Sequence, residues 1–205
     1  LTVAGGGMAL AGALLAFGQH NLGRLMGYAV MIDVGAVLLG VGLQSPAGVQ
    51  SALVTLALSG LAIPLWAIGL ERLRRAAGGD DFDSLRGLAR RYPFSTAAVI
   101  FGLLSLVGFP ATAGFAGRWA LLALLAHVHP TGAILLLLGM VSVGVVCARG
   151  LAALLTPRDD SEEVTLAESP FSIAASAGGV LAVLLFGLFP QWLLTGVAGA
   201  ASVFT

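Results

Sequence analysis

Arg118 lies in an apolar part of the sequence, directly after a cluster of residues that interrupt helices. Four such residues precede it closely: Gly108, Pro110, Gly114 and Gly117. Proline removes a backbone donor and clashes with the preceding turn, and glycine loosens a helix further. In lipid, such a break persists only where protein or a water-filled cavity satisfies the freed backbone groups. An ionisable group beside it therefore predicts a functional site; the alternative is a plain loop from which Arg118 extends to the headgroups.

Asp33 is a second charge at membrane depth, near the middle of the apolar run from Leu25 to Leu43. A carboxylate there costs about 2.5–3.5 kcal/mol on insertion scales, so it must face protein, water or a partner. Either its carboxyl is held neutral by hydrogen bonds to neighbouring helices, or it belongs to a buried polar path. Arg24 is about 13 Å away along a helix and cannot pair with it. We expect Asp33 and Arg118 to share a buried network.

His20 and Arg24 lie in the polar interruption that precedes this run, and they complete the set of proton-path candidates. No pair of histidines or cysteines at ligand spacing predicts a metal site. His127 and His129 flank a predicted helix end, where an interfacial position is expected. No cofactor is predicted in this chain.

The composition predicts an integral membrane protein. Hydrophobic residues make up 58% of the chain and charged residues 10%, whereas a soluble domain carries about 25% charged residues. The long continuous apolar runs exclude an outer-membrane barrel and favour an all-α, polytopic transmembrane helix bundle. The net charge of zero gives no sign of nucleic-acid binding.

One transmembrane domain covers residues 1–205, with about seven apolar spans and two polar loops, 71–92 and 156–170. The predicted spans are residues 3–18, 25–43, 51–70, 93–109, 111–128, 131–155 and 171–189. The loop from Glu71 to Tyr92 holds six arginines, so the positive-inside rule places it in the cytoplasm. The chain begins inside an apolar segment without a methionine, which predicts a partial chain rather than a signal peptide.

Two stretches carry a resemblance to a known family. The stretch Gln19-His-Asn-Leu-Gly-Arg-Leu-Met-Gly-Tyr28 resembles Gln-x-Asn-x-Lys-Arg-Leu-x-Ala-Tyr. The stretch Ser105-Leu-Val-Gly-Phe-Pro-Ala-Thr-Ala-Gly-Phe-Ala-Gly-Arg118 resembles Ser-Leu-Ala-Gly-Ile-Pro-Pro-Thr-Ala-Gly-Phe-x-Gly-Lys. Both elements mark the antiporter-like membrane subunits of respiratory complex I and of multisubunit cation/proton antiporters. The spacing and the closing Gly-Leu-Phe-Pro-Gln191 also fit, and the N-type subunit is the most similar.

The resemblance covers nearly the whole chain as the C-terminal half of a fourteen-helix subunit. It implies a discontinuous helix and half of an inverted-repeat, antiporter-like fold in the plasma membrane of a bacterium, beside other membrane subunits. It also implies proton translocation coupled to NADH-quinone oxidoreduction, in a subunit that is not itself the catalytic one. The family topology, with an outward N-terminus, places the Glu71–Tyr92 loop on the outer side, against the positive-inside rule.

Departures from the family pattern leave other functions open. Gly23 stands at the family's lysine, Asp33 at its usual histidine or glutamine, and Ser59 where several members carry histidine and lysine. Arg118 replaces a lysine or glutamate, and arginine is a poor proton shuttle because it stays charged. The alternatives are a subunit of a cation/proton antiporter or membrane-bound hydrogenase, and a degenerate structural subunit that does not conduct.

Overall fold

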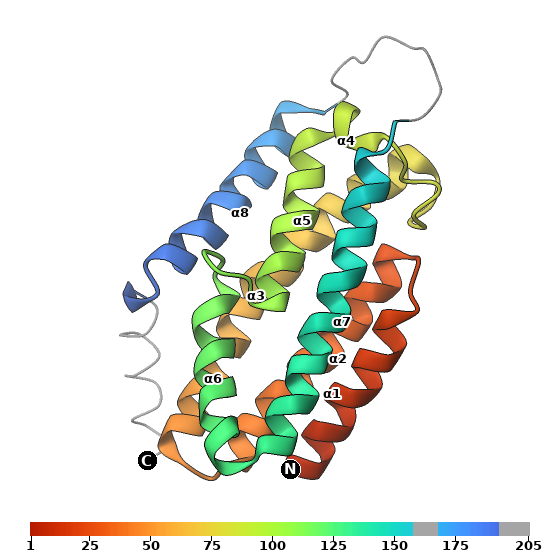
Figure 1. The fold of residues 1–205 in the computed structure, drawn as a ribbon. Helices are drawn as coiled ribbons and strands as arrows, with labels where there is room; N and C mark the ends of the chain where they lie inside the picture. The colour runs from red at the N-terminus through yellow and green to blue at the C-terminus, as the bar shows by residue number, and fades with distance from the viewer. Residues whose placement is uncertain (158–167, 193–205) are drawn as a thin grey trace.

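A computed structural model of the chain describes residues 1–157 and 168–192, and it confirms an all-helical protein (Figure 1). These residues form eight helices: α1 Thr2–Phe17, α2 Leu22–Gly42, α3 Pro46–Ala77, α4 Leu88–Arg91, α5 Pro93–Val107, α6 Gly114–Val128, α7 Pro130–Leu155 and α8 Pro170–Leu188. Four of them, α2, α3, α7 and α8, are long and apolar enough to cross a membrane, and α1, α5 and α6 are shorter apolar helices.

Helices α5 and α6 follow one another along the bundle. Each has 15 residues, which is about 22 Å of helix, less than the roughly 30 Å of a bilayer core. In Figure 1, α5 runs from the α4 end of the bundle to its middle, and α6 continues to the end where the N-terminus lies. The seven apolar segments are therefore helices, but α5 and α6 together traverse the bundle once, so the break interrupts one crossing instead of separating two.

Local sequence signals explain where the helices begin and end. The side chains of Asn21 and Ser45 cap α2 and α3, by accepting hydrogen bonds from the backbone N–H groups of Arg24 and Gly48. Helix α3 ends at Gly78, whose φ of 76° places it in the left-handed conformation that glycine adopts readily.

The polar stretch from Glu71 to Tyr92 is only partly a loop. Helix α3 continues through Ala77, with an ion pair of 2.7 Å between Glu71 and Arg75 one turn apart. Such pairs support an exposed helix. The loop that remains folds onto the turn between α1 and α2, where the backbone N–H of Phe82 donates to the carbonyl oxygen of His20 over 2.9 Å.

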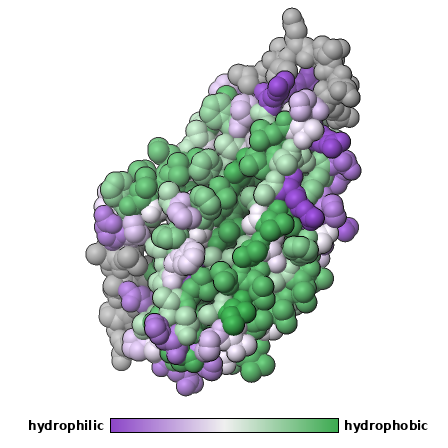
Figure 2. All heavy atoms as spheres, viewed as in Figure 1, coloured by the Kyte–Doolittle hydropathy of each residue, from purple (hydrophilic) through white to green (hydrophobic). Residues whose placement is uncertain are grey.

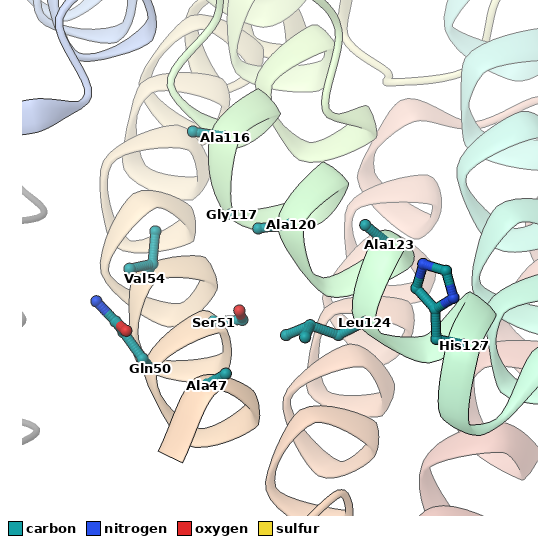
Figure 3. Close-up of a pocket in the computed structure, with 10 residues that line it drawn as sticks. All are labelled: Ala47, Gln50, Ser51, Val54, Ala116, Gly117, Ala120, Ala123, Leu124 and His127. Atoms are coloured by element: carbon teal, nitrogen blue, oxygen red, sulfur yellow. The ribbon is translucent and has the colours of Figure 1, made fainter. Parts of the chain in front are cut away.

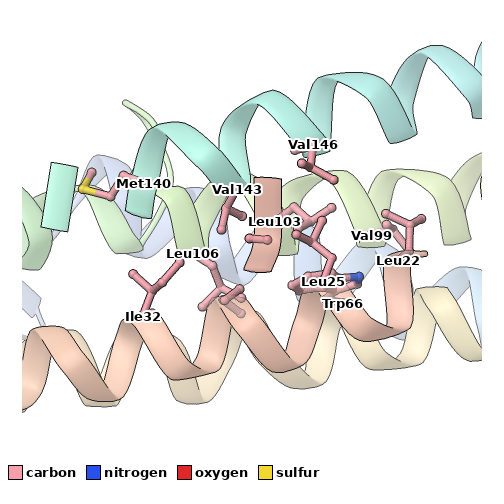
Figure 4. Packing of buried hydrophobic residues seen from close by; sticks show 14 of the residues in the cluster. Leu22, Leu25, Ile32, Trp66, Val99, Leu103, Leu106, Met140, Val143 and Val146 are labelled. Carbon is pink, nitrogen blue, oxygen red and sulfur yellow. The ribbon is translucent and has the colours of Figure 1, made fainter. Parts of the chain in front are cut away.

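Apolar side chains fill the space between α2, α3, α5 and α7, including Leu25, Trp66, Leu103 and Val143 (Figure 4). Glycines bring the backbones close together, as expected for helices packed in a membrane. A Cβ on Gly102 of α5 would lie 2.8 Å from the Cβ of Trp66 on α3. This packing holds α5 firmly against α3.

The outer surface is also largely apolar. Figure 2 shows apolar side chains over most of one face, with hydrophilic ones mainly toward its ends. Among the described residues, every charged side chain other than Asp33 and Arg118 lies at or near the α4 end. The surface and the charge distribution are those of a multi-pass membrane protein.

Candidate functional site

The break between α5 and α6 is a compact turn that satisfies its own backbone groups. Gly108 ends α5 with a φ of 77°, and Ala111 has a φ of 69°, which is uncommon for a residue with a side chain. The side chain of Ser105 accepts a hydrogen bond from the N–H of Gly114 over 3.1 Å. Thr112 donates its hydroxyl to the carbonyl oxygen of Phe109 over 2.6 Å. Internal bonds of this kind allow irregular backbone at membrane depth.

The four residues expected to interrupt the helix divide into two groups. Gly108 and Pro110 lie in the turn itself, whereas Gly114 and Gly117 lie inside the first turns of α6. A Cβ on Gly114 would lie 1.8 Å from the carbonyl oxygen of Ser105, and one on Gly117 would lie 3.1 Å from the hydroxyl of Thr55. These two glycines therefore permit close packing and do not break the helix.

Arg118 and Asp33 form a buried ion pair beside this turn. Nη2 of Arg118 donates to Oδ1 of Asp33, and their side chains are 2% and 7% exposed. Nε of Arg118 has no hydrogen-bond partner among the described residues. A Cβ on Gly108 would lie 2.8 Å from Cδ of Arg118, and the indole N–H of Trp119 donates to the Gly108 carbonyl oxygen over 3.0 Å. The shape of the turn thus fixes the position of the guanidinium.

Three buried hydroxyl residues lie along one face of α3. Ser51, Thr55 and Ser59 are four residues apart, so they share a face of the helix. Thr55 donates to the carbonyl oxygen of Ser51 over 2.8 Å, and Ser59 donates to that of Thr55 over 2.9 Å. Of these three residues, the family pattern pointed to Ser59 alone. The spacing of four residues is the sequence signal that also places Ser51 and Thr55 on the same face of the helix.

A groove of about 450 Å³ between α3 and α6 leads to this row of hydroxyls (Figure 3). Ser51 and Gln50 line it from α3, and Gly117 and His127 line it from α6. Neither Arg118 nor Asp33 lines this groove. Its remaining walls are mostly alanine and other apolar side chains.

The other two proton-path candidates lie elsewhere. Arg24 is exposed at the start of α2 and lines a cavity of about 560 Å³ at the α4 end. His20 lies on the turn before α2, with its ring centroid 6.1 Å from that of Phe82. The structure therefore brings Asp33 and Arg118 together and leaves His20 and Arg24 at the surface.

Gly23 is enclosed by the polar loop that folds onto α2. A Cβ there would lie 2.2 Å from Oδ2 of Asp80. Oδ1 of the same carboxylate accepts a hydrogen bond from the side chain of Asn21. An acidic group thus occupies the space that a side chain at position 23 would need.

Asp81, in the same loop, accepts hydrogen bonds from the N–H of Ser84 over 3.1 Å and from its hydroxyl over 2.7 Å. These bonds hold the pKa of the carboxyl below its ordinary value of 3.8. The described residues contain no group of three histidine, cysteine or acidic side chains that could hold a metal ion.

In the part of the chain that the structure describes, long apolar helices, an interruption between α5 and α6 and a buried ion pair beside it are features of a polytopic membrane protein. The chain belongs to the family described as NADH:quinone oxidoreductase/Mrp antiporter, transmembrane, whose model matches residues 1–145. The family resemblance of the two motifs is therefore confirmed.

Individual relatives agree with this assignment. The chain is 32% identical to NADH-quinone oxidoreductase subunit N 3 of Streptomyces griseus, covering 95% of this chain and 36% of the relative. It is similar to a chain in respiratory complex I from Thermus thermophilus with bound NADH, at 27% identity and a TM-score of 0.84, covering 100% of this chain and 43% of the other. A chain of the Mrp complex from Dietzia sp. shares the fold, at 17% identity and a TM-score of 0.85, over 98% of this chain and 46% of the other. The chain thus spans less than half the length of each.

Proposed function

We propose that this chain contributes part of a proton path in an antiporter-like subunit of an NADH-quinone oxidoreductase-type complex. The buried ion pair of Arg118 and Asp33 is the observation that carries the proposal. Charges at membrane depth are expensive and mark ion or proton pathways. In this proposal α5 and α6 are the discontinuous helix of half of an inverted repeat, in a complex with other membrane subunits, in a bacterial plasma membrane.

The two members of the pair have different roles. A guanidinium stays charged, so Arg118 is the fixed charge and Asp33 is the group that accepts and releases the proton. A proton that reaches Asp33 neutralises the carboxylate and weakens its attraction to Arg118. When Asp33 releases that proton, its carboxylate pairs with Arg118 again. The two side chains thus alternate between a paired and an unpaired arrangement as the proton binds and leaves, which is what a proton relay requires.

The hydroxyls of α3 are placed to connect this pair with the end of the bundle opposite α4, where the described residues include no acidic or arginine side chain. Gly40 of α2 packs against Ala52 of α3. Asp33 and Ser59 each lie seven residues from that contact, toward the same end, because the two helices run antiparallel (Figure 1). Ser59 is therefore close to the level of Asp33, and Ser51 opens into the groove between α3 and α6.

The distribution of charge supports one orientation in the membrane. Among the described residues, the α4 end carries every arginine other than Arg118, so the positive-inside rule places this end in the cytoplasm. The family topology implies the outer side, and the proposed orientation follows the charges.

Two other functions compete with this one. A cation/proton antiporter or membrane-bound hydrogenase would use the same helices, and the shared fold with the Mrp chain is compatible with it. A structural subunit that conducts nothing is compatible with glycine and arginine at positions 23 and 118, where the family has lysines.

Proton uptake by the assembled complex distinguishes the proton-path role from the structural one. Arg118→Ala and Asp33→Asn should each abolish the proton uptake contributed by this subunit, while quinone reduction and assembly persist. Arg75→Ala is the matched control, because Arg75 is 76% exposed and pairs with Glu71 one turn away. Unchanged uptake in both variants at the ion pair would establish the structural role.

A further inference from the structure

Glu168, which lies just before α8, closes the start of α5. Its carboxylate accepts hydrogen bonds from the N–H of Phe94 over 3.0 Å, from the N–H of Ser95 over 2.7 Å and from the hydroxyl of Ser95 over 2.5 Å. The residue before α5, Tyr92, offers no side-chain cap. A carboxylate at a helix N-terminus satisfies free N–H groups and complements the helix dipole. The cap of α5 therefore comes from a segment more than 70 residues away in the sequence.

The other end of α8 rests on the break. A Cβ on Gly187 would lie 2.3 Å from the carbonyl oxygen of Ala111 and 2.5 Å from the carbonyl carbon of Thr112. Helices α5 and α8 both run from the α4 end toward the middle of the bundle (Figure 1). Thus α8 contacts α5 where α5 begins and contacts the turn that follows its end.

Helix α8 packs along α5 and α3 but is more exposed than the other long helices. In its most apolar window, 17% of residues are buried, against 44–50% in the windows of α2, α3 and α7. Its buried Val183 belongs to an apolar cluster with Leu65 of α3 and Ala98 of α5. The cap at Glu168 and the close contact at Gly187 add to this packing, one at the start of α5 and one at the turn that follows its end.

We propose that Glu168 is a positioning residue for the Arg118–Asp33 pair, acting through α8 and the break. The carboxylate binds the start of α5 and so holds the start of α8 beside it. At the other end of α8, the close contact of Gly187 with Ala111 and Thr112 makes the position of the turn depend on the position of α8. The turn in turn sets Arg118 through the contact at Gly108. The effect of Glu168 on proton transfer rests on the proposed function. The mechanical connection, by which Glu168 holds the turn through α8, does not depend on that function.

Hydrogen exchange in the assembled complex tests the mechanical connection by itself. Glu168→Ala should speed exchange of the amides at Phe94 and Ser95, and also in the turn at residues 108–113, by about fivefold, the value expected for loss of a cap. Glu168→Gln, which keeps an acceptor oxygen, should restore at least half of the protection. Glu71→Ala removes an acidic side chain at the same end of the bundle and should leave the turn unchanged. Faster exchange at Phe94 and Ser95 alone would overturn the proposal.

Two glycines of α8 provide a second, matched test. Gly187→Ala adds a methyl group against the turn, whereas Gly178→Ala adds one where no atom lies within 4 Å. Gly187→Ala should speed exchange in residues 108–113 and reduce protons translocated per quinone reduced about twofold or more, while Gly178→Ala should change neither. Equal effects of the two variants would overturn the role of α8.

The two readouts separate the failure of this inference from the failure of the proposed function. If Arg118→Ala leaves proton uptake intact, the proton path is wrong, but the exchange result for Glu168→Ala still decides the mechanical connection. If Arg118→Ala abolishes uptake and the Glu168 and Gly187 variants leave both readouts unchanged, the positioning role is wrong.

Discussion

Arg118 differs from the residue of the family pattern, yet it lies in a buried ion pair beside the helix break. Its guanidinium cannot release a proton, so a relay at this position must use the carboxylate of Asp33. The pair is almost completely buried, and removing one partner of a buried pair leaves an uncompensated charge. The position of the family's lysine is therefore retained as a charge, while the carboxylate that we propose exchanges a proton lies on α2.

Gly23 gives a prediction at the same scale. Gly23→Lys, which restores the residue of the family pattern, should leave the thermal stability of the complex unchanged or raise it slightly. The atom nearest its Cβ is a carboxylate oxygen of Asp80, the end of a side chain that can move aside and then pair with the new ammonium group. An exposed ion pair contributes about 0–1 kcal/mol. The measurement is the midpoint of thermal unfolding of the purified complex in detergent.

Asp80→Ala supplies the control for that prediction. It removes the carboxylate that would pair with the new ammonium group, so Gly23→Lys combined with Asp80→Ala should be less stable than Gly23→Lys alone. A loss of several degrees for Gly23→Lys with Asp80 intact would contradict this pairing.

At the scale of elements, the contact between α5 and α6 is set by backbone proximity. Gly114→Ala should separate the two helices, because its Cβ would lie 1.8 Å from the carbonyl oxygen of Ser105. Backbone cannot yield as a flexible side chain does, so we expect a loss of about 3 kcal/mol or more, measured as lower assembly and a lower unfolding midpoint. Gly60→Ala in α3, where no atom lies within 4 Å of the added methyl group, is the control and should have little effect.

For the whole molecule, the charged residues determine how the bundle is oriented in the membrane. A cysteine in place of Arg86, which is exposed at the α4 end, should react with a membrane-impermeant maleimide in inside-out vesicles. A cysteine in place of His129, exposed at the opposite end, should react in right-side-out vesicles. The natural Cys147 is buried and can remain in place. The reverse labelling pattern would invert the proposed orientation.

The sequence alone determined the membrane class, the positions of the apolar helices and the existence of a break near Arg118. These properties follow from composition and from local backbone chemistry, since proline, glycine and long apolar runs act within a few residues of where they stand. The two motifs also sufficed to recognise the family.

Only the tertiary structure decided which charges meet. Asp33 and Arg118 are 85 residues apart, and no local pattern fixes the rotation of α2 and α6 that brings their side chains together. The same holds for the cap of α5 by Glu168 and for the merging of two apolar segments into one crossing. Each depends on how separate helices pack against one another, and packing is set by contacts between distant residues rather than by the periodicity within one helix.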